Sequence, residues 1–222
     1  MLLQIDAYTG RLLDAIKELG VADNTIFIFT ADNGPEMLPG HNGWGGPWRG
    51  SYFTGLEGSL RVPFIIRWPG KVPAGAVSND IVHEMDMYAT FAKWTGAEIP
   101  TDRIIDSIDQ SDFLTGKRDK SNRDGFVVYV GNDLFGVKWR NWKMMFKEVD
   151  RGTDAKKTYD FPRFYNLYAD PKEEYPLTKA TAGHFWTRWP MGAILTEHAN
   201  SLNKEPPIKP GTPDPYVPKK SQ

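Results

Sequence analysis

The sequence predicts an α/β protein: part of a doubly wound sheet, followed by a small antiparallel subdomain. Two observations predict this class. The amphipathic segment 1–20 leads into an apolar run at 25–30, which is the helix-to-strand alternation of a doubly wound sheet. Three short runs rich in aromatic and β-branched residues follow at 126–130, 135–139 and 142–147. Because short turns separate these runs, we expect an antiparallel meander.

The first helix is predicted from apolar residues that recur at near-helical spacing between Leu2 and Leu19. Gly20 stands where a helix C-cap is expected, and the strand at 25–30 comes next. A second strand is expected at 61–68, ending in a turn at Pro69.

A second helix is expected from Met85 to Gly96. Asp86 would lie in its first turn, where an acidic side chain interacts favourably with the helix dipole, so we interpret it as structural.

Three regions are expected along the chain. Residues 1–120 would form part of the α/β domain, 121–205 the antiparallel subdomain, and 206–222 a Pro-rich extended tail. A polar stretch at 117–124 has the composition of a linker or exposed loop. The segment 36–51, rich in Gly and Pro and without periodicity, predicts a long loop across one end of the sheet.

Asp32 and Asn33 come directly after the first predicted strand. Ligands of open α/β sheets gather at the carboxyl ends of strands, where loop residues are held by a rigid scaffold. A carboxylate beside a carboxamide offers hard oxygen ligands, which suit Ca²⁺ or Mg²⁺ better than zinc. The same residues with Gly34 also fit an ordinary turn, and the triplet by itself leaves both interpretations open.

Several ordered motifs between residues 1 and 176 add to this triplet. They are Asp32-Asn33-Gly34, Trp48-Arg49-Gly50, Glu57-Gly58-Ser59-Leu60-Arg61-Val62-Pro63, Trp68-Pro69-Gly70, Tyr165-Asn166-Leu167-Tyr168, Asp170-Pro171 and Glu173-Glu174. In this order the motifs resemble those of the sulfatase family. The resemblance implies an alkaline-phosphatase-like fold and hydrolysis of a sulfate ester. It also implies a Ca²⁺ ion, with Mg²⁺ as the alternative, bound by Asp32 and Asn33.

The resemblance also identifies features that these 222 residues lack. The family's nucleophile is a formylglycine made from a Cys or Ser in a Cys/Ser-x-Pro-x-Arg motif, and neither a cysteine nor such a motif is present. We therefore expect the C-terminal portion of a sulfatase, without the nucleophile-bearing N-terminal half and inactive alone. Half a metal site predicts weak cation binding. An open sheet edge predicts poor solubility or association with a complementary N-terminal half.

Three further site residues are candidates. Tyr52 stands where the family places a sulfate-binding lysine, and a neutral phenol cannot supply that positive charge. Arg49 is the candidate that could replace it in binding the substrate, although a structural arginine fits equally well. His41, in the loop after Asp32 and Asn33, is a candidate catalytic residue because the charge of histidine is easily tuned near neutrality.

Composition excludes some functions and leaves others open. With 27 basic and 28 acidic residues and no block of like charge, the chain lacks the basic footprint of a nucleic-acid-binding protein. No apolar run approaches the roughly 20 residues of a membrane span. We find no signal peptide in residues 1–20, and the compartment stays open, with periplasmic or secreted locations compatible with the family. The absence of cysteine rules out disulfides within the chain.

Two other functions compete with a sulfatase. A phosphodiesterase or phosphonate hydrolase of the same superfamily would share the fold and the Asp-Asn metal pair. A carbohydrate-binding module, or one that only complements another fragment, would use the tryptophans as sugar-stacking platforms. Large aromatic residues more often fill cores and domain seams, and we prefer that reading except for Trp44 and Trp48, which lie in the loop expected to shape the pocket.

Overall fold

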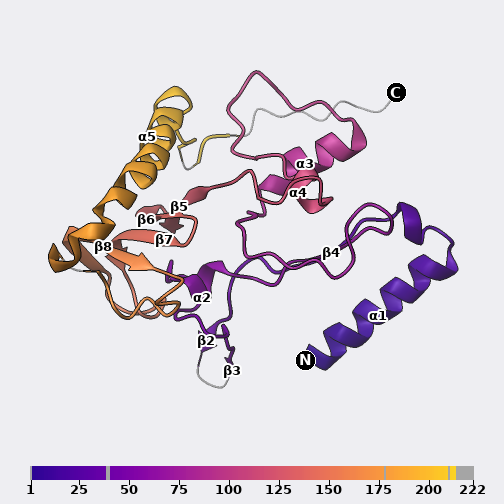
Figure 1. The fold of residues 1–222 in the computed structure, drawn as a ribbon, viewed down its shortest axis with the longest axis horizontal. Helices are drawn as coiled ribbons and strands as arrows, with labels where there is room; N and C mark the ends of the chain where they lie inside the picture. The colour runs from indigo at the N-terminus through magenta and orange to yellow at the C-terminus, as the bar shows by residue number, and fades with distance from the viewer. Residues whose placement is uncertain (1, 39–40, 178, 210, 214–222) are drawn as a thin grey trace.

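The computed structural model describes residues 2–38, 41–177, 179–209 and 211–213 (Figure 1). Its largest sheet is an antiparallel meander of four strands, each paired with the next along the chain. These strands are β5 (Gly125–Val130), β6 (Asp133–Trp139), β7 (Trp142–Glu148) and β8 (Lys157–Asn166). The structure confirms the three predicted strands of the meander and adds β8, which the sequence analysis did not predict.

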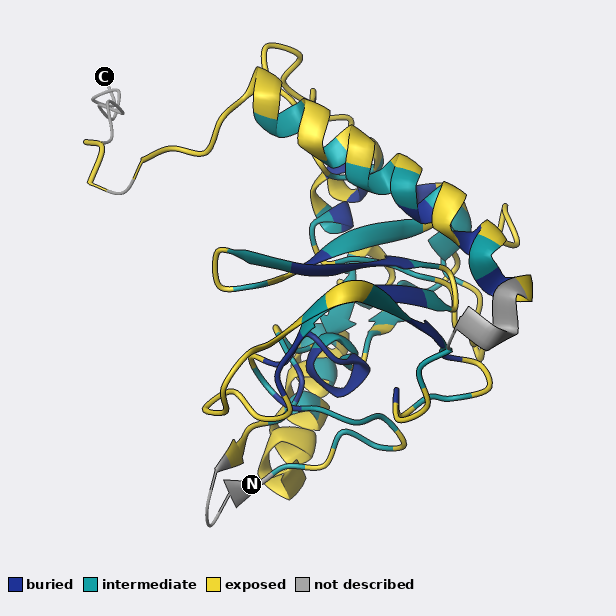
Figure 2. Cartoon of the chain, turned by 90° about the vertical axis from the view of Figure 1, so that its left-hand side faces the viewer, coloured by how far each residue is buried: buried dark blue, intermediate teal, exposed yellow. Residues whose placement is uncertain are grey.

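Alternation of side chains gives this sheet a core on each face. One face packs against helix α5 (Arg188–Lys204), which lies across the sheet in Figure 2. The buried residues of that core are Val137, Met144, Phe164 and Met191. The opposite face buries Val128, Phe135, Met145, Val149, Tyr165 and Leu167 and contacts Leu60 from the first half of the chain. Neighbours such as Met144 and Met145 therefore serve different cores, as the period of two in a strand requires.

The first half of the chain contains helix α1 (Leu2–Glu18), the 3₁₀ turn η1 (Ala22–Asn24) and an antiparallel strand pair. The pair is β1 (Phe27–Phe29) with β4 (Ile65–Arg67), in the register Ile28 to Ile66. Helix and strands lie where the sequence predicts them, and Gly20 follows α1 with a φ of 69°. Strand β1 is half-buried, and no third described strand pairs with β1 or β4.

The remaining elements are short, except for α3 (Asp86–Thr95). That helix ends at Gly96 in the left-handed conformation, which confirms the predicted cap. The short elements are the hairpin β2 (Met37–Leu38) and β3 (His41–Asn42), the single turns α2 (Glu57–Leu60) and α4 (Ser111–Leu114), and the 3₁₀ helix η2 (Lys179–Thr187). The loop expected at 36–51 thus contains one small hairpin.

The end of the chain differs from the expectation in one respect. Helix α5 was not predicted, because its apolar residues do not form a clear helical stripe and Pro190 is a helix breaker except in a first turn, where it lies here. Of the Pro-rich tail expected at 206–222, only 206–209 and 211–213 are described. Among the described helices, none is long and apolar enough to cross a membrane.

Candidate functional site

Backbone hydrogen bonds bring the predicted metal-binding loop onto the turn of α2. The N–H of Gly34 donates to the carbonyl oxygen of Ser59 at 2.8 Å. The N–H of Tyr52 donates to the carbonyl oxygen of Pro35 at 3.0 Å. Segments 32–35, 49–52 and 57–60 therefore form one compact junction, although they are distinct motifs in the sequence.

Two glycines permit this close approach. A Cβ atom on Gly34 would lie 1.8 Å from the carbonyl oxygen of Gly58, and one on Gly58 would lie 2.5 Å from the carbonyl oxygen of Gly50. The N–H of Gly58 also donates to the carbonyl oxygen of Arg49 at 2.8 Å. No side chain larger than hydrogen fits at either position without a backbone shift, so the glycines of these motifs serve packing.

The junction forms part of the wall of a broad open groove of about 2410 Å³. Asp32 and Asn33 line it, together with Trp48, Tyr52 and Arg61. The groove is thus lined by the predicted metal ligands and by two aromatic side chains, Trp48 and Tyr52, of which Tyr52 stands at the family's lysine position. The groove is larger than the roughly 300–1,000 Å³ of an ordinary small-molecule site, so a ligand bound beside Asp32 and Asn33 would fill only part of it.

Asp32 and Asn33 have the chemistry of cation ligands. The Asp32 side chain is exposed and has no hydrogen bond or ion pair with any described residue. Asn33 donates its Nδ2 to the carbonyl oxygen of Gly34 at 2.8 Å, which leaves its Oδ1 as a free acceptor. Two hard oxygens fit part of the six to eight that Ca²⁺ requires. Within the described residues, no group of three or more His, Cys, Asp or Glu could hold a metal ion, and the ligand role of Asp32 and Asn33 stays a prediction.

Arg49 is held by protein groups at every guanidinium nitrogen. Its Nη1 pairs with Asp150 at 2.9 Å and its Nη2 with Glu148 at 2.8 Å. Its Nε donates to the carbonyl oxygen of Lys172 at 2.9 Å, and Nη2 also donates to that of Glu173 at 2.7 Å. Arg49 therefore joins the first half of the chain to the meander, and it is not among the groove-lining residues. Its expected substrate-binding role stays a prediction that these contacts do not support.

A buried carboxylate, Glu57, meets three cations next to the groove. Its Oε2 lies 2.6 Å from Arg61 Nε and 2.5 Å from Lys138 Nζ, and its Oε1 lies 3.3 Å from Lys143 Nζ. Burial opposes ionisation of Glu57, but the charges of Lys143 and Lys138 outweigh it, and the pKa of Glu57 is lowered well below its usual value. Glu57 is therefore ionised at neutral pH and serves as the counter-ion of the cluster.

Glu173 extends this cluster to the motif near the end of β8. Its Oε1 lies 2.8 Å from Lys143 Nζ, and its Oε2 accepts the backbone N–H of Glu57 at 2.7 Å. Lys138 and Lys143 face each other across β6 and β7, and such a pair of like charges is stable only with acids beside it. Both glutamates belong to the motifs named above, but their sequence context predicts no role for either. The signal that sequence reasoning missed was two lysines at inward-facing positions of predicted strands.

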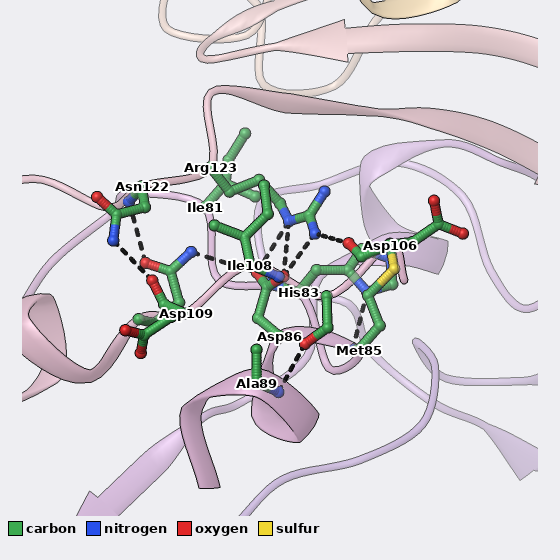
Figure 3. Close-up of polar contacts among 12 residues, drawn as sticks. Ile81, His83, Met85, Asp86, Ala89, Asp106, Ile108, Asp109, Asn122 and Arg123 are labelled. Atoms are coloured by element: carbon green, nitrogen blue, oxygen red, sulfur yellow. Dashed lines mark hydrogen bonds and ion pairs between the residues drawn. The ribbon is translucent and has the colours of Figure 1, made fainter. Parts of the chain in front are cut away.

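Asp86 forms a separate buried network (Figure 3). Arg123 binds its carboxylate through Nη2 at 2.5 Å and Nε at 2.8 Å, and the backbone N–H groups of His83 and Ile108 donate to it at 3.0 Å. These contacts are consistent with the predicted structural role of Asp86 in the first turn of α3, and the arginine accounts for its burial as an ion.

Burial and the Arg123 charge lower the pKa of His83, so this histidine is neutral at neutral pH.

The other candidate residues lie as follows. Tyr52 is half-buried on the groove, and the backbone of His41 lies in β3, while its side chain is outside the part of the chain that the structure describes. Trp44, 87% exposed, and Trp48 both line the groove, in line with their expected place beside the pocket. Trp186 packs edge-on against both Trp139 and Trp142, at 5.8 and 6.1 Å between ring centroids, which suits a packing role.

Comparison with known proteins gives the same family along most of the chain. The family model named Sulfatase matches residues 1–97, and the model for the C-terminal region of aryl-sulfatase matches residues 121–219. The chain is similar to the N-acetylgalactosamine-6-sulfatase of Mus musculus, with 31% identity over 90% of this chain and 42% of that protein. It is also similar to the steryl-sulfatase of Homo sapiens, with 30% identity over 82% of this chain and 36% of that protein.

Solved structures agree. The PsFucS1 sulfatase from Pseudoalteromonas sp. superimposes with a TM-score of 0.83 at 32% identity, covering 93% of this chain and 43% of that one. The chain thus spans about 40% of the length of the relatives that it matches.

Proposed function

The chain belongs to the sulfatase family, and from this we propose that the protein containing it is a sulfuric ester hydrolase with its active site on the groove beside Asp32 and Asn33. One observation carries the proposal. The two oxygen ligands follow strand β1, have free oxygen atoms, and lie on a groove walled by family motifs.

Ca²⁺ is the ion that these ligands fit best. Asp32 and Asn33 would supply two of its oxygen ligands, and acids outside these 222 residues would supply others. The bound ion would place positive charge beside the sulfate oxygens and favour attack at sulfur. Asn33 retains an acceptor for this role, because only its Nδ2 is used in the bond to the carbonyl oxygen of Gly34.

The remaining groove residues would position the ester. Trp44 and Trp48 line the groove and would offer apolar faces to the ester. Tyr52, at the family's lysine position, donates a neutral hydrogen bond at most, so this site needs its cation elsewhere.

We further propose that a segment outside these 222 residues supplies the formylglycine nucleophile and covers the exposed apolar surface of the first half. The exposed residues support this: Leu2 is 80% exposed, Leu3 85%, Leu12 57%, and Ile65 on β4 62%. Burying such a surface is favourable at about 25 cal/mol per Å². An α/β segment that continues the sheet beside β1 and β4 would fit it.

The substrate class is tested by comparing two esters. The protein that carries these residues, expressed with all sequence encoded in frame, is assayed for release of 4-nitrophenol from 4-nitrophenyl sulfate and from the phosphodiester bis(4-nitrophenyl) phosphate. The proposal predicts a higher kcat/KM for the sulfate, with loss of activity in a Ca²⁺ chelator. Turnover of the phosphodiester alone would support the phosphodiesterase alternative.

The partner proposal has its own test. The part of the Pseudoalteromonas enzyme outside its matched region is co-expressed with this chain, and the mixture is analysed by size-exclusion chromatography with light scattering. We expect a one-to-one complex that elutes as a single species. A monodisperse, cooperatively melting monomer of the 222-residue chain, unaffected by the added segment, contradicts the proposal.

A further inference from the structure

Arg61 is fixed on two sides, while its outer nitrogens have no bond within the described part of the chain. Its Nε donates to Glu57 Oε2 at 2.6 Å, and its guanidinium carbon lies 4.8 Å from the centre of the Trp48 ring. No described hydrogen bond involves its Nη1 or Nη2. The side chain is 28% exposed and lines the groove. A guanidinium held in this way presents a fixed pair of N–H donors, which matches the geometry of an oxyanion.

The charges around Arg61 do not cancel. Three cations, Arg61, Lys138 and Lys143, face two carboxylates, Glu57 and Glu173, so the cluster carries one positive charge in excess. Lys143 is fully buried and the Lys138 side chain is 6% exposed, so the excess reaches solvent mainly through Arg61. Burial lowers the pKa of Lys138 to about 8, and repulsion from Arg61 adds to this shift. An anion bound at Arg61 would complete the neutralisation.

Arg61 also belongs to the junction that holds the metal-binding loop. It comes two residues after Ser59, whose carbonyl oxygen accepts the N–H of Gly34. Asn33 and Tyr52 line the same groove. Arg49, the arginine that precedes α2, has every guanidinium nitrogen bonded to protein groups and lies outside the lining. Of the two arginines that flank α2, only Arg61 lines the groove and has guanidinium nitrogens without a bond to any described residue.

We infer that Arg61, positioned by Glu57 and Trp48, binds an oxyanion of the substrate and supplies the positive charge that Tyr52 does not. The inference rests on the proposed sulfatase function for the nature of the substrate only. Its physical content is that the groove binds a sulfate-like anion through the Arg61 Nη atoms, and this can be measured without any turnover.

Isothermal titration of inorganic sulfate into the purified protein is the first experiment. Arg61→Met is expected to weaken binding at least tenfold. Arg140→Met is the matched control, because Arg140 also lines the groove, stacks on a tryptophan at 4.9 Å and pairs with an acid, but its side chain is 55% exposed. The control is expected to change affinity less than threefold. Equal affinity of wild type and Arg61→Met, or no sulfate binding by wild type, overturns the inference.

Two additional variants keep the test decisive if Arg61→Met does not fold. Arg61→Lys keeps the charge and removes the planar pair of donors, and Trp48→Leu removes only the stacking face. Each is expected to weaken sulfate binding at least threefold, with a circular dichroism spectrum like that of wild type. Wild-type affinity in both variants contradicts the proposed geometry.

Kinetics with two substrates identify which anion Arg61 binds. A raised KM for 4-nitrophenyl sulfate, which has a single anionic group, assigns Arg61 to the reacting sulfate. A raised KM only for a disulfated sugar assigns it to a second acidic substituent. Sulfate binding through Arg61 without hydrolysis of any ester leaves the inference intact and refutes the proposed function, while unchanged KM for both substrates overturns the inference.

Discussion

Replacing Lys143 with methionine is expected to destabilise the protein far more than removing the partly exposed lysine of the same strand, Lys147. Lys143 is fully buried between Glu57 and Glu173, at 3.3 and 2.8 Å. Methionine retains much of the aliphatic volume but leaves two buried carboxylates with one fewer cation. Removing one partner of a buried ion pair costs about 3–5 kcal/mol, because the remaining charge stays desolvated.

The control is Lys147→Met on the same strand. Lys147 pairs with Asp133 at 3.1 Å, but the two side chains are 25% and 42% exposed. Exposed pairs contribute about 0–1 kcal/mol, so the control should change stability little. For a chain of this length, about 1 kcal/mol shifts Tm by roughly 2–4 °C, which predicts a fall of about 6–20 °C for Lys143→Met.

The assay is urea denaturation followed by tryptophan fluorescence, with Tm from circular dichroism as a second measure. Adding Glu173→Gln to Lys143→Met removes one of the stranded charges and should recover at least about 1 kcal/mol, within the range of coupling between contacting residues. A loss below about 1 kcal/mol for Lys143→Met, equal to that of the control, would refute the argument that this buried cluster holds the two halves of the chain together.

Three other changes test separate parts of the structure. Asp86→Asn leaves its buried arginine partner without an anion and should cost about 3–5 kcal/mol in urea denaturation, and a cost below about 1 kcal/mol would count against the network in Figure 3. Gly34→Ala forces a Cβ atom against the carbonyl oxygen of Gly58 and should destabilise the protein by about 1–3 kcal/mol. Gly10→Ala has open space around the new Cβ atom and should not destabilise the protein. Equal melting curves for the two variants would contradict this. The pKa of Glu57 is depressed in the fold, so its ionised form stabilises the protein above its unfolded pKa of about 4.5, and this stabilisation is lost as pH falls. From about pH 5 to pH 3 the free energy of unfolding should therefore fall more steeply in wild type than in Glu57→Gln. Parallel slopes for the two proteins would exclude this.

The elements that the sequence predicted well have strong local signals. Gly20 and Gly96 both follow helices and both adopt positive φ, which is a conformation that glycine takes without strain. The three predicted strands of the meander alternate between two cores. Strand β8 was missed because Lys157, Asp160 and Arg163 interrupt its alternation of apolar and polar residues, and because Pro162 lies within it. An edge strand tolerates proline, since one of its sides needs no ladder hydrogen bonds.

The candidate site shows a sharper limit of sequence reasoning. Asp32 and Asn33 could be proposed as ligands because a strand exit and a family motif coincide there. The partnership of Glu57 with Glu173 joins residues 116 positions apart and depends on how the meander docks on α2, which no local pattern reveals. For the same reason the sequence offered Arg49 as the groove cation, whereas its contacts lie with the meander. The division of the chain at residues 120 and 205 stays a prediction.

The most direct test of the account is sulfate release from 4-nitrophenyl sulfate by the complete in-frame gene product carrying Asp32→Ala. Asp102→Ala is the control, since Asp102 is exposed, pairs only with its neighbour Arg103 among the described residues and does not line the groove. The account predicts a loss of at least about 100-fold in kcat/KM for Asp32→Ala, comparable to removing one strong electrostatic group from an active site, and no change for Asp102→Ala. Wild-type turnover by Asp32→Ala would contradict the assignment of the active site to this groove.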